Sequence, residues 1–351
     1  MSRLHKSLLA LAAACSFSAA AQADEPVVTL KVHHHMPVHS VTQVDFLEPW
    51  AKKITAESNG RIQFQFYPSM QLGGTPPQLI DQVRDGVADI VWTLPGYSTG
   101  RFPLISVFEQ PFMSSSAEAT SQAMWEFMQR HGDKELAGIH LLATQVTDAA
   151  EVHSTKRPIK TLADFRGLKI RASNRTATKL ISLFGATPVA MPVPQIPEAL
   201  SKGVVDGAIV PWDVVPPLKL HELVKYHTET APGQPALMYT TMILAMNPDS
   251  YAKLPDDLKK IIDANSGLEL SRFAGHLYDT QVVETGHKLA QAQGNQIMTL
   301  SGEETLKWKK VATPLYQDWI DEVEDKGYSD GAGLLSEARQ LIDKYQAQRT
   351  Q

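Results

Sequence analysis

Hydrophobic positions follow two different periods in the first hundred residues, and the alternation predicts a sheet covered by helices. Strand-like patterns occupy 27–32 and 61–67, separated by a helical pattern over 44–54. A second helix begins at Thr75-Pro76, with proline in its first turn, and a short buried strand follows over 88–92. This β-α-β-α-β order predicts a largely parallel sheet with helices on its faces.

A second α/β unit begins near residue 150, and we find no internal repeat and no low-complexity linker between the units. Its predicted elements, in chain order, are a strand over 168–171, a helix capped by Ser173 or Asn174 and ending at Gly185, a brief helix at 199–200, a strand over 206–210, a helical stretch running with little interruption from 254 to about 292, and a helix over 303–323. Two domains also fit the length of 351 residues.

The amino-terminal segment has the pattern of an export signal. Arg3 and Lys6 precede an apolar run, and Ala21-Gln22-Ala23 supplies small residues at the two positions that a signal peptidase reads. A lipoprotein site at Cys15 is disfavoured because leucine is missing three residues before it. We therefore predict a cleaved signal peptide over 1–23, a periplasmic product, and no membrane span after it.

Charge and cysteine content exclude several classes of function. The chain has 33 Lys and Arg against 38 Asp and Glu, a formal net charge of −5, and no basic run that would bind nucleic acid. Its single cysteine, Cys15, rules out an intrachain disulfide framework and cysteine-based metal sites. We expect no cofactor.

The sequence has no P-loop, dinucleotide-binding turn, G-x-S-x-G or H-E-x-x-H motif, so an enzyme would have to rest on scattered residues. The run His33-His34-His35 is the one metal-like feature. We interpret it as a source of one hydrogen bond to a ligand and take His34 as the candidate. A metal-binding protein and a secreted enzyme remain the alternative functions.

Strand ends in two facing α/β units would line a cleft, since ligands of open α/β sheets bind beyond the carboxyl ends of the strands. Arg171 ends a predicted strand directly before a capped helix start. A guanidinium there can hold a carboxylate through two parallel hydrogen bonds. The alternative is an ion pair with a structural carboxylate at a domain edge.

Several spaced motifs resemble the periplasmic substrate-binding proteins of tripartite ATP-independent (TRAP) transporters, the DctP-like family. They lie in the family's order along essentially the whole chain: Tyr67-Pro-Ser-Met-Gln-Leu-Gly-Gly74, Val87-Ala-Asp-Ile-Val91, Phe108-Glu-Gln-Pro-Phe112, Leu162-Ala-Asp-Phe-Arg-Gly-Leu-Lys-Ile-Arg171, Gly185-Ala-Thr-Pro-Val189 and Gly203-Val-Val-Asp-Gly207. The resemblance implies an α/β fold of two lobes with crossover strands and a long helix spanning both. It places lobe I in 24–148 plus about 236–276 and lobe II in 149–235 plus about 277–351.

The resemblance also implies roles for individual residues. Arg171 matches the family arginine that pairs with the ligand carboxylate, and Asn174 matches a polar position that touches the ligand. Relative to the sialic-acid branch, Glu151 replaces a second arginine and Val210 replaces a polar residue. Glu151 would repel a second carboxylate by about 4 kcal/mol at ~4 Å and an effective dielectric near 20. The alternative is that Glu151 turns out of the cleft and pairs with Lys156 or Arg157.

Aromatic residues near the strand ends favour an apolar or aromatic ligand body. Trp212 follows a strand end beside Asp213, and Trp92 ends another strand, although Trp92 suits a core position equally well. We therefore expect a solute-binding protein, not an enzyme, that takes a monocarboxylate with an apolar or aromatic body. It would deliver that carboxylate to the membrane permease subunits of a TRAP transporter.

Overall fold

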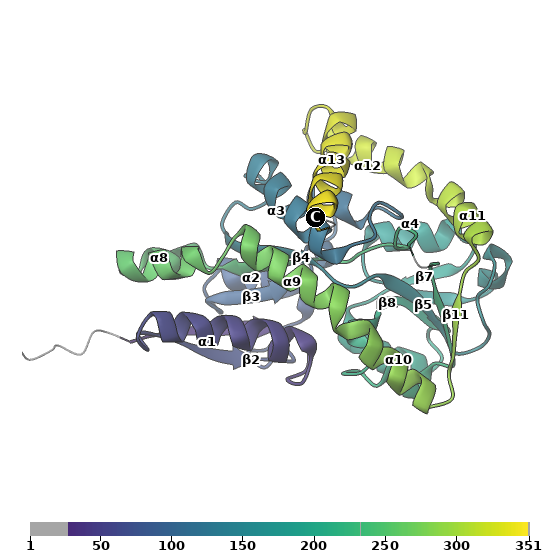
Figure 1. The fold of residues 1–351 in the computed structure, drawn as a ribbon, viewed down its shortest axis with the longest axis horizontal. Helices are drawn as coiled ribbons and strands as arrows, with labels where there is room; N and C mark the ends of the chain where they lie inside the picture. Colours follow the sequence, from purple (N-terminus) through teal and green to yellow (C-terminus); the bar gives the residue numbers. More distant parts are fainter. Residues whose placement is uncertain (1–26, 232, 350–351) are drawn as a thin grey trace, which may run out of the picture.

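The computed structural model describes residues 27–231 and 233–349, which form two mixed β-sheets with helices packed around them (Figure 1). The first sheet has the strand order β2 (Ile62–Tyr67), β1 (Val28–His34), β3 (Ile90–Thr93), β10 (Thr241–Met246) and β4 (His140–Val146). The second has the order β11 (Gln296–Thr299), β9 (Tyr226–Glu229), β5 (Ala150–Ser154), β8 (Gly207–Pro211), β6 (Lys169–Ala172) and β7 (Thr187–Ala190).

Both sheets are mixed, whereas the sequence predicted a largely parallel first sheet. In the first sheet, β1 pairs in parallel with β2 and β3, and β10 lies antiparallel to β3 and β4. In the second, β6 is parallel to β7 and β8, and β5 is antiparallel to β8 and β9. The antiparallel strands β4, β5 and β10 carry the chain between the sheets, and hydropathy patterning around 140–154 and 241–246 did not identify them.

Helices cover the faces of both sheets. Their bounds are α1 Glu48–Glu57, α2 Leu79–Arg84, α3 Ala117–His131, α4 Arg175–Leu183, α5 Ile196–Ser201, α6 Leu220–Leu223, α7 Pro248–Ala252, α8 Asp256–Ala264, α9 Leu268–Thr280, α10 Val282–Ala292, α11 Gly302–Ala312, α12 Pro314–Asp325 and α13 Gly331–Arg349. In Figure 1, α9 and α10 follow each other diagonally from the first sheet to the second, and α12 returns across the top toward α13.

The helical stretch predicted over 254–292 is divided into α8, α9 and α10. α8 ends at Ala264, and Gly267, with φ +82°, precedes α9. Gln281 is a turn residue with φ −115° and ψ −26° that separates α9 from α10. The helix predicted over 303–323 is similarly two helices, because Pro314 lacks the N–H that a continuous helix needs and starts α12 instead. The two-lobed α/β architecture with a helical connection across both lobes is confirmed.

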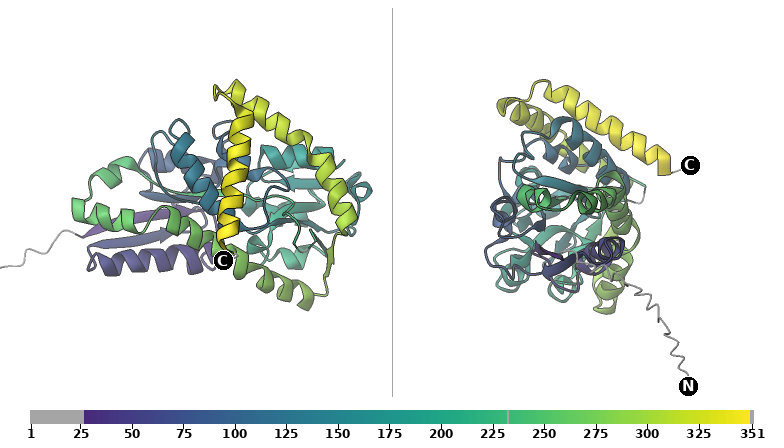
Figure 2. Two further views of the ribbon diagram at one scale, coloured as in Figure 1. Left: turned by 45° about the horizontal axis from the view of Figure 1, so that its top comes forward. Right: turned by 90° about the vertical axis from the view of Figure 1, so that its left-hand side faces the viewer.

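The last helix lies beside the first lobe. Arg130 and Glu126 on α3 contact Glu337 and Lys344 on α13, and Figure 2 shows α13 running over α3. The predicted boundary at about 277 assigned this helix to lobe II.

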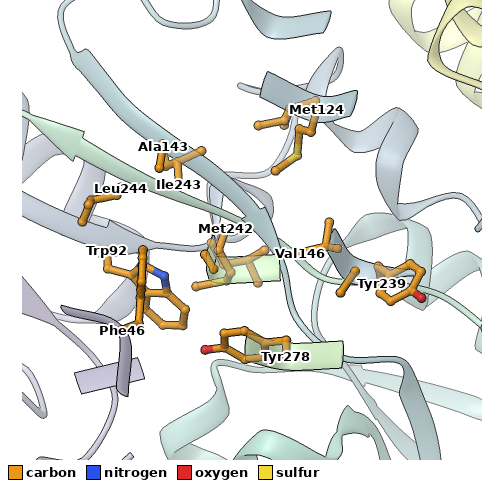
Figure 3. Close-up of a cluster of buried hydrophobic side chains, with 14 of the residues drawn as sticks. Phe46, Trp92, Met124, Ala143, Val146, Tyr239, Met242, Ile243, Leu244 and Tyr278 are labelled. Carbon is orange, nitrogen blue, oxygen red and sulfur yellow. The ribbon is translucent and has the colours of Figure 1, made fainter. Parts of the chain in front are cut away.

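The first lobe has a dense apolar core that reaches the space between the sheets. Figure 3 shows Trp92 and Met242 from neighbouring strands in this cluster, with Tyr278 of α9 below them. Trp92 and Met242 are each about 2% exposed, and Tyr278 is fully buried. The core therefore packs against the side chains at the strand ends.

None of the helices in residues 27–231 and 233–349 has the length and apolar character of a membrane span.

Candidate functional site

A pocket lies between the ends of the two sheets. The first lobe contributes residues at the ends of β1, β3, β4 and β10, and the second contributes residues at the ends of β6 and β8. The residues that line it are His35, Met36, Trp92, Leu94, Tyr97, Thr147, Arg171, Ser173, Val193, Pro211, Asp213, Val214, Thr240 and Met242. A mainly apolar wall with a few polar groups is typical of small-molecule sites.

Arg171 is held rigidly at the floor of this pocket. Its Nε donates to the carbonyl of Met191 at 3.0 Å and its Nη1 to the carbonyl of Ile209 at 3.4 Å. The side chain is 1% exposed. Burial lowers the pKa of Arg171 and the neighbouring Tyr97 opposes that shift, but a guanidinium stays protonated in proteins. The site therefore carries a fixed buried cation.

Three buried atoms on the pocket wall have no hydrogen-bond partner within residues 27–231 and 233–349: Arg171 Nη2, His35 Nδ1 and Asp213 Oδ1. We call them the open polar atoms. Other buried atoms of the described residues also lack partners, among them both ring nitrogens of His33. The three open polar atoms differ in that they line one pocket, where a ligand could supply the partners.

Aromatic rings form one side of the pocket. His35 stacks on Trp92 with ring centroids 5.4 Å apart, and Tyr97 meets His35 edge-on at 5.7 Å. Burial lowers the pKa of His35 to about 3, so its ring is neutral at physiological pH. The indole N–H of Trp92 donates to Gln145 at 3.1 Å and is not available to a ligand. Trp92 therefore offers an apolar surface.

The Tyr97 hydroxyl joins the two lobes. It accepts a hydrogen bond of 3.0 Å from the backbone N–H of Val193, on the opposite wall of the pocket. Tyr97 follows β3 after the turn Pro95-Gly96, where a side chain on Gly96 would lie 2.9 Å from Cβ of Asn174. The lobes are thus in direct contact at the pocket entrance.

A family model described as bacterial extracellular solute-binding protein, family 7 (DctP), matches residues 33–322. The chain belongs to this family.

Solved TRAP solute-binding proteins have the same fold as this family member. One from Rhodoferax ferrireducens T118, in complex with copurified benzoate, is 46% identical, covers 92% of this chain and 99% of its own, and has a TM-score of 0.90. One from a marine metagenome, with 3-hydroxybenzoate, is 45% identical, covers 91% and 99%, and has a TM-score of 0.88. A third, from Bordetella bronchiseptica with both mandelate enantiomers, is 28% identical, covers 90% and 99%, and has a TM-score of 0.82.

Three of the residues predicted to form the site line the pocket, namely Arg171, Trp92 and Asp213. Asn174 lies farther out, in a hollow that also includes Tyr97 and Ser173. There its Oδ1 caps α4 by accepting from the N–H of Ala177 at 2.8 Å.

His34 is not on the pocket wall, and its neighbour His35 is. His34 Nε2 bonds Gln43 Oε1 at 3.0 Å, inside the first lobe. Successive side chains of a strand point to opposite faces, which separates these two neighbours. In the part of the chain that the structure describes, no three His, Cys, Asp or Glu residues are arranged to hold a metal ion.

Trp212 lies in a second polar cluster, inside lobe II. Its ring stacks on His227 at 4.7 Å and meets His153 and His287 edge-on at 5.0 and 4.7 Å. Its indole N–H donates to Glu229 Oε1 at 2.7 Å, and His287 bonds the same carboxylate. We call these five residues the paired cluster.

Both ring nitrogens of His153 and of His227 have partners in the paired cluster. His153 Nε2 must donate to the carbonyl of Val210 at 3.0 Å, so its Nδ1 accepts from His227 Nδ1 at 2.7 Å. His227 Nε2 then accepts from the amide of Asn295 at 3.2 Å. Burial lowers the pKa of His153 to about 4 and that of His227 to about 2, which keeps both rings neutral. Val210 therefore supports this cluster and does not line the pocket.

Glu151 also lies away from the pocket wall. It is buried on β5, and its carboxyl accepts from the N–H of Thr230 at 3.2 Å. Burial, and then the charge of Glu229, raise the pKa of Glu151 well above its usual range. A neutral Glu151 outside the pocket does not repel a second carboxylate.

Sequence reasoning missed Tyr97, Thr240 and Met242. It also chose His34 as the ligand contact, whereas the neighbouring residue His35 lies on the pocket wall. Tyr97 follows β3 through a Pro-Gly turn, so the strand-end rule carried four residues further would have included it. Thr240 and Met242 lie at the start of β10. The antiparallel direction of β10 brings its amino end to the edge where the parallel strands finish, and no local signal marks that direction.

Proposed function

We propose that this solute-binding protein captures an aromatic monocarboxylate by pairing the ligand's carboxylate with Arg171. The observation that carries the proposal is the buried guanidinium whose Nη2 is one of the open polar atoms. A carboxylate accepts two parallel hydrogen bonds from a guanidinium, and a charge-assisted bond of this kind is about twice as strong as a neutral one.

The composition of the wall supports a single carboxylate on an aromatic body. Among the described residues that line the pocket, Arg171 is the one Lys or Arg, and His35 is neutral. The rings of His35, Trp92 and Tyr97 offer flat apolar surface for an aromatic body. Two relatives that are at least 45% identical carry benzoate and 3-hydroxybenzoate, which fit this description.

The family supports a role in transport rather than catalysis. The loaded protein delivers its ligand to the permease subunits of a TRAP transporter, which is driven by an ion gradient and not by ATP. It acts in the periplasm after removal of residues 1–23, a segment that lies outside the described residues.

Closure of the two lobes accompanies binding in this proposal. Tyr97 from the first lobe and Val193 from the second bond across the entrance, and the pocket draws its wall from both lobes. Hinge closure around a ligand is the common motion of two-lobed binding proteins. The lobe bounds follow the sequence prediction except at α13, which we assign to the first lobe.

Thermal-shift measurements followed by calorimetry test the proposal. Benzoate, phenylacetate and mandelate are compared with succinate and glucuronate on the mature protein. A ligand at 100 times its dissociation constant stabilises by about 2.7 kcal/mol. We expect stabilisation by at least one aromatic acid and none by the two other acids. Tighter binding of succinate or glucuronate than of every aromatic acid contradicts the proposal.

A further inference from the structure

Asp213 occupies a fixed position on the pocket wall. It lies in the turn Trp212–Val214 directly after β8 and is 3% exposed. The carboxylate of Asp148 holds this turn by accepting from the N–H groups of Trp212 at 2.6 Å and Asp213 at 3.3 Å. The backbone of Asp213 therefore cannot move without breaking these bonds.

The side chain of Asp213 has hydrogen-bonding capacity that the protein does not use. Its Oδ1 is one of the open polar atoms, and the described residues provide no salt bridge to this carboxyl. Arg171, the cation of the same pocket, instead contacts the carbonyls of Met191 and Ile209. Burial raises the pKa of Asp213 to about 7, and the charge of Asp213 contributes to raising that of the neighbouring Asp148.

The surroundings of Asp213 define the chemistry that would satisfy it. Apolar side chains make up much of the wall, including Met36, Leu94, Val214 and Met242. Oδ1 accepts a hydrogen bond when the carboxyl is ionised and also when the proton resides on Oδ2, so a donor on the ligand body would satisfy it in either state. An unsubstituted aromatic ring would leave Oδ1 buried and unpaired, which is unfavourable.

We propose that Asp213 is a specificity-determining residue that accepts a hydrogen bond from a hydroxyl on the ligand, so that hydroxylated aromatic monocarboxylates are preferred over unsubstituted ones. This inference rests on the proposed function, because it assumes that Arg171 takes the carboxylate. The relative that is 45% identical carries 3-hydroxybenzoate, a ligand with both groups, and the relative that is 46% identical carries benzoate, which has no hydroxyl.

Isosteric ligand pairs test the inference on the unaltered protein. Calorimetry compares 3-hydroxybenzoate with 3-methylbenzoate and 4-hydroxybenzoate with 4-methylbenzoate, since hydroxyl and methyl groups are similar in size. We expect the hydroxyl compound of at least one pair to bind about tenfold tighter or more, because a site built to bond a hydroxyl rejects the analogue that lacks it.

Two variants assign that preference to Asp213. Asp213→Leu replaces the acceptor with an apolar group, and we expect the ratio between hydroxyl and methyl ligands to fall to about twofold or to reverse. Asp213→Asn keeps an amide oxygen that can accept, and we expect it to retain part of the preference. If Asp213→Leu does not fold, the isosteric pairs and Asp213→Asn decide the question.

The outcomes separate this inference from the proposed function. Equal binding of hydroxyl and methyl ligands by the unaltered protein overturns the role of Asp213 while leaving an aromatic-acid receptor intact. A preference that survives in Asp213→Leu also overturns it. If no member of any pair binds while benzoate, phenylacetate or mandelate does, the role of Asp213 is overturned and the proposed function stands. If none of these aromatic acids binds, the proposed function itself fails.

Discussion

Two buried clusters of aromatic and ionisable side chains lie near the ends of the strands. They differ in whether their polar atoms have hydrogen-bond partners among the described residues. The pocket between the lobes contains Arg171, His35 and Asp213, each with an open polar atom. In the paired cluster, His153 and His227 use both ring nitrogens, and Trp212 and His287 share the carboxylate of Glu229.

This difference separates a binding site from a structural core of similar composition. A polar network that is satisfied internally stabilises and orders the fold, whereas a rigid group with an unmet bond is available to a ligand. Residue type alone does not make the distinction, because both clusters contain histidine, tryptophan and carboxylates.

The largest expected effect comes from removing the cation of the pocket. Arg171→Ala is expected to weaken binding of an aromatic carboxylate by more than a hundredfold, because losing one partner of a buried charge pair costs about 3–5 kcal/mol. Calorimetry measures the loss, and circular dichroism checks the fold.

Arg84→Ala is the matched control for this variant. Arg84 is about half-exposed and forms surface ion pairs with Asp81 and Asp85, which contribute little in water. We expect its ligand affinity to stay within about twofold of the unaltered protein. An Arg171→Ala variant that folds and binds as tightly as the control would refute the assignment of the carboxylate.

Overpacking of the paired cluster should lower the stability of the protein. A Cβ atom on Gly286 of α10 would lie 2.5 Å from Cε3 of Trp212, so Gly286→Ala must displace the indole. We expect a loss of about 1–3 kcal/mol in the free energy of unfolding, although alanine usually favours helices over glycine. Urea unfolding measures it, and affinity for the ligand should change by about threefold at most.

Gly302→Ala is the matched control, since a Cβ on this glycine at the start of α11 meets nothing within 4 Å. Its stability should be unchanged or slightly higher. If Gly286→Ala is as stable as Gly302→Ala, the tight packing assigned to the paired cluster is wrong.

The pH dependence of stability tests the buried, protonated state assigned to Glu151. The folded protein keeps a proton on this buried carboxyl, while the unfolded chain releases it above about pH 4.3. The group's contribution to stability is therefore present at low pH and falls as pH rises toward its raised pKa. Glu151→Gln keeps the neutral form, so its stability relative to the unaltered protein should increase from pH 5 to pH 8, by about 1.4 kcal/mol per unit of pKa shift expressed in that interval. Urea unfolding at both pH values measures this.

The same variant should have little effect on ligand selection. Because Glu151 lies off the pocket wall, the ratio of benzoate to isophthalate affinity should change by about twofold at most. Strong binding of isophthalate by Glu151→Gln alone would mean that Glu151 repels the second carboxylate after all.

Local sequence signals were sufficient for the position of Arg171, because an apolar strand that ends before a capped helix start is visible in a short window. They also placed Trp92 and Asp213 at strand ends. Trp212 could not be placed this way. Its neighbours His227 and His287 are distant in sequence. The pairing of β5 with β8 and β9 brings His227 to Trp212, and the packing of α10 brings His287.

The same limit applies to the fold. Patterning identified β1, β2, β3, β6 and β8, which have strong local alternation or buried runs, but it could not give the antiparallel insertion of β10 between β3 and β4. That insertion depends on contacts of β10 with β4, about 100 residues away in sequence, and with β3, about 150 residues away. It also brings Thr240 and Met242 to the pocket, which explains why they were missed.

A crystal structure of the mature protein with 3-hydroxybenzoate tests the central claim most directly. We expect the ligand's carboxylate to lie within hydrogen-bond distance of Arg171 Nη2 and its ring to lie beside His35 and Trp92. The paired cluster should be unchanged. A ligand carboxylate bound away from Arg171, or one inserted among His153, Trp212 and His227, would contradict it.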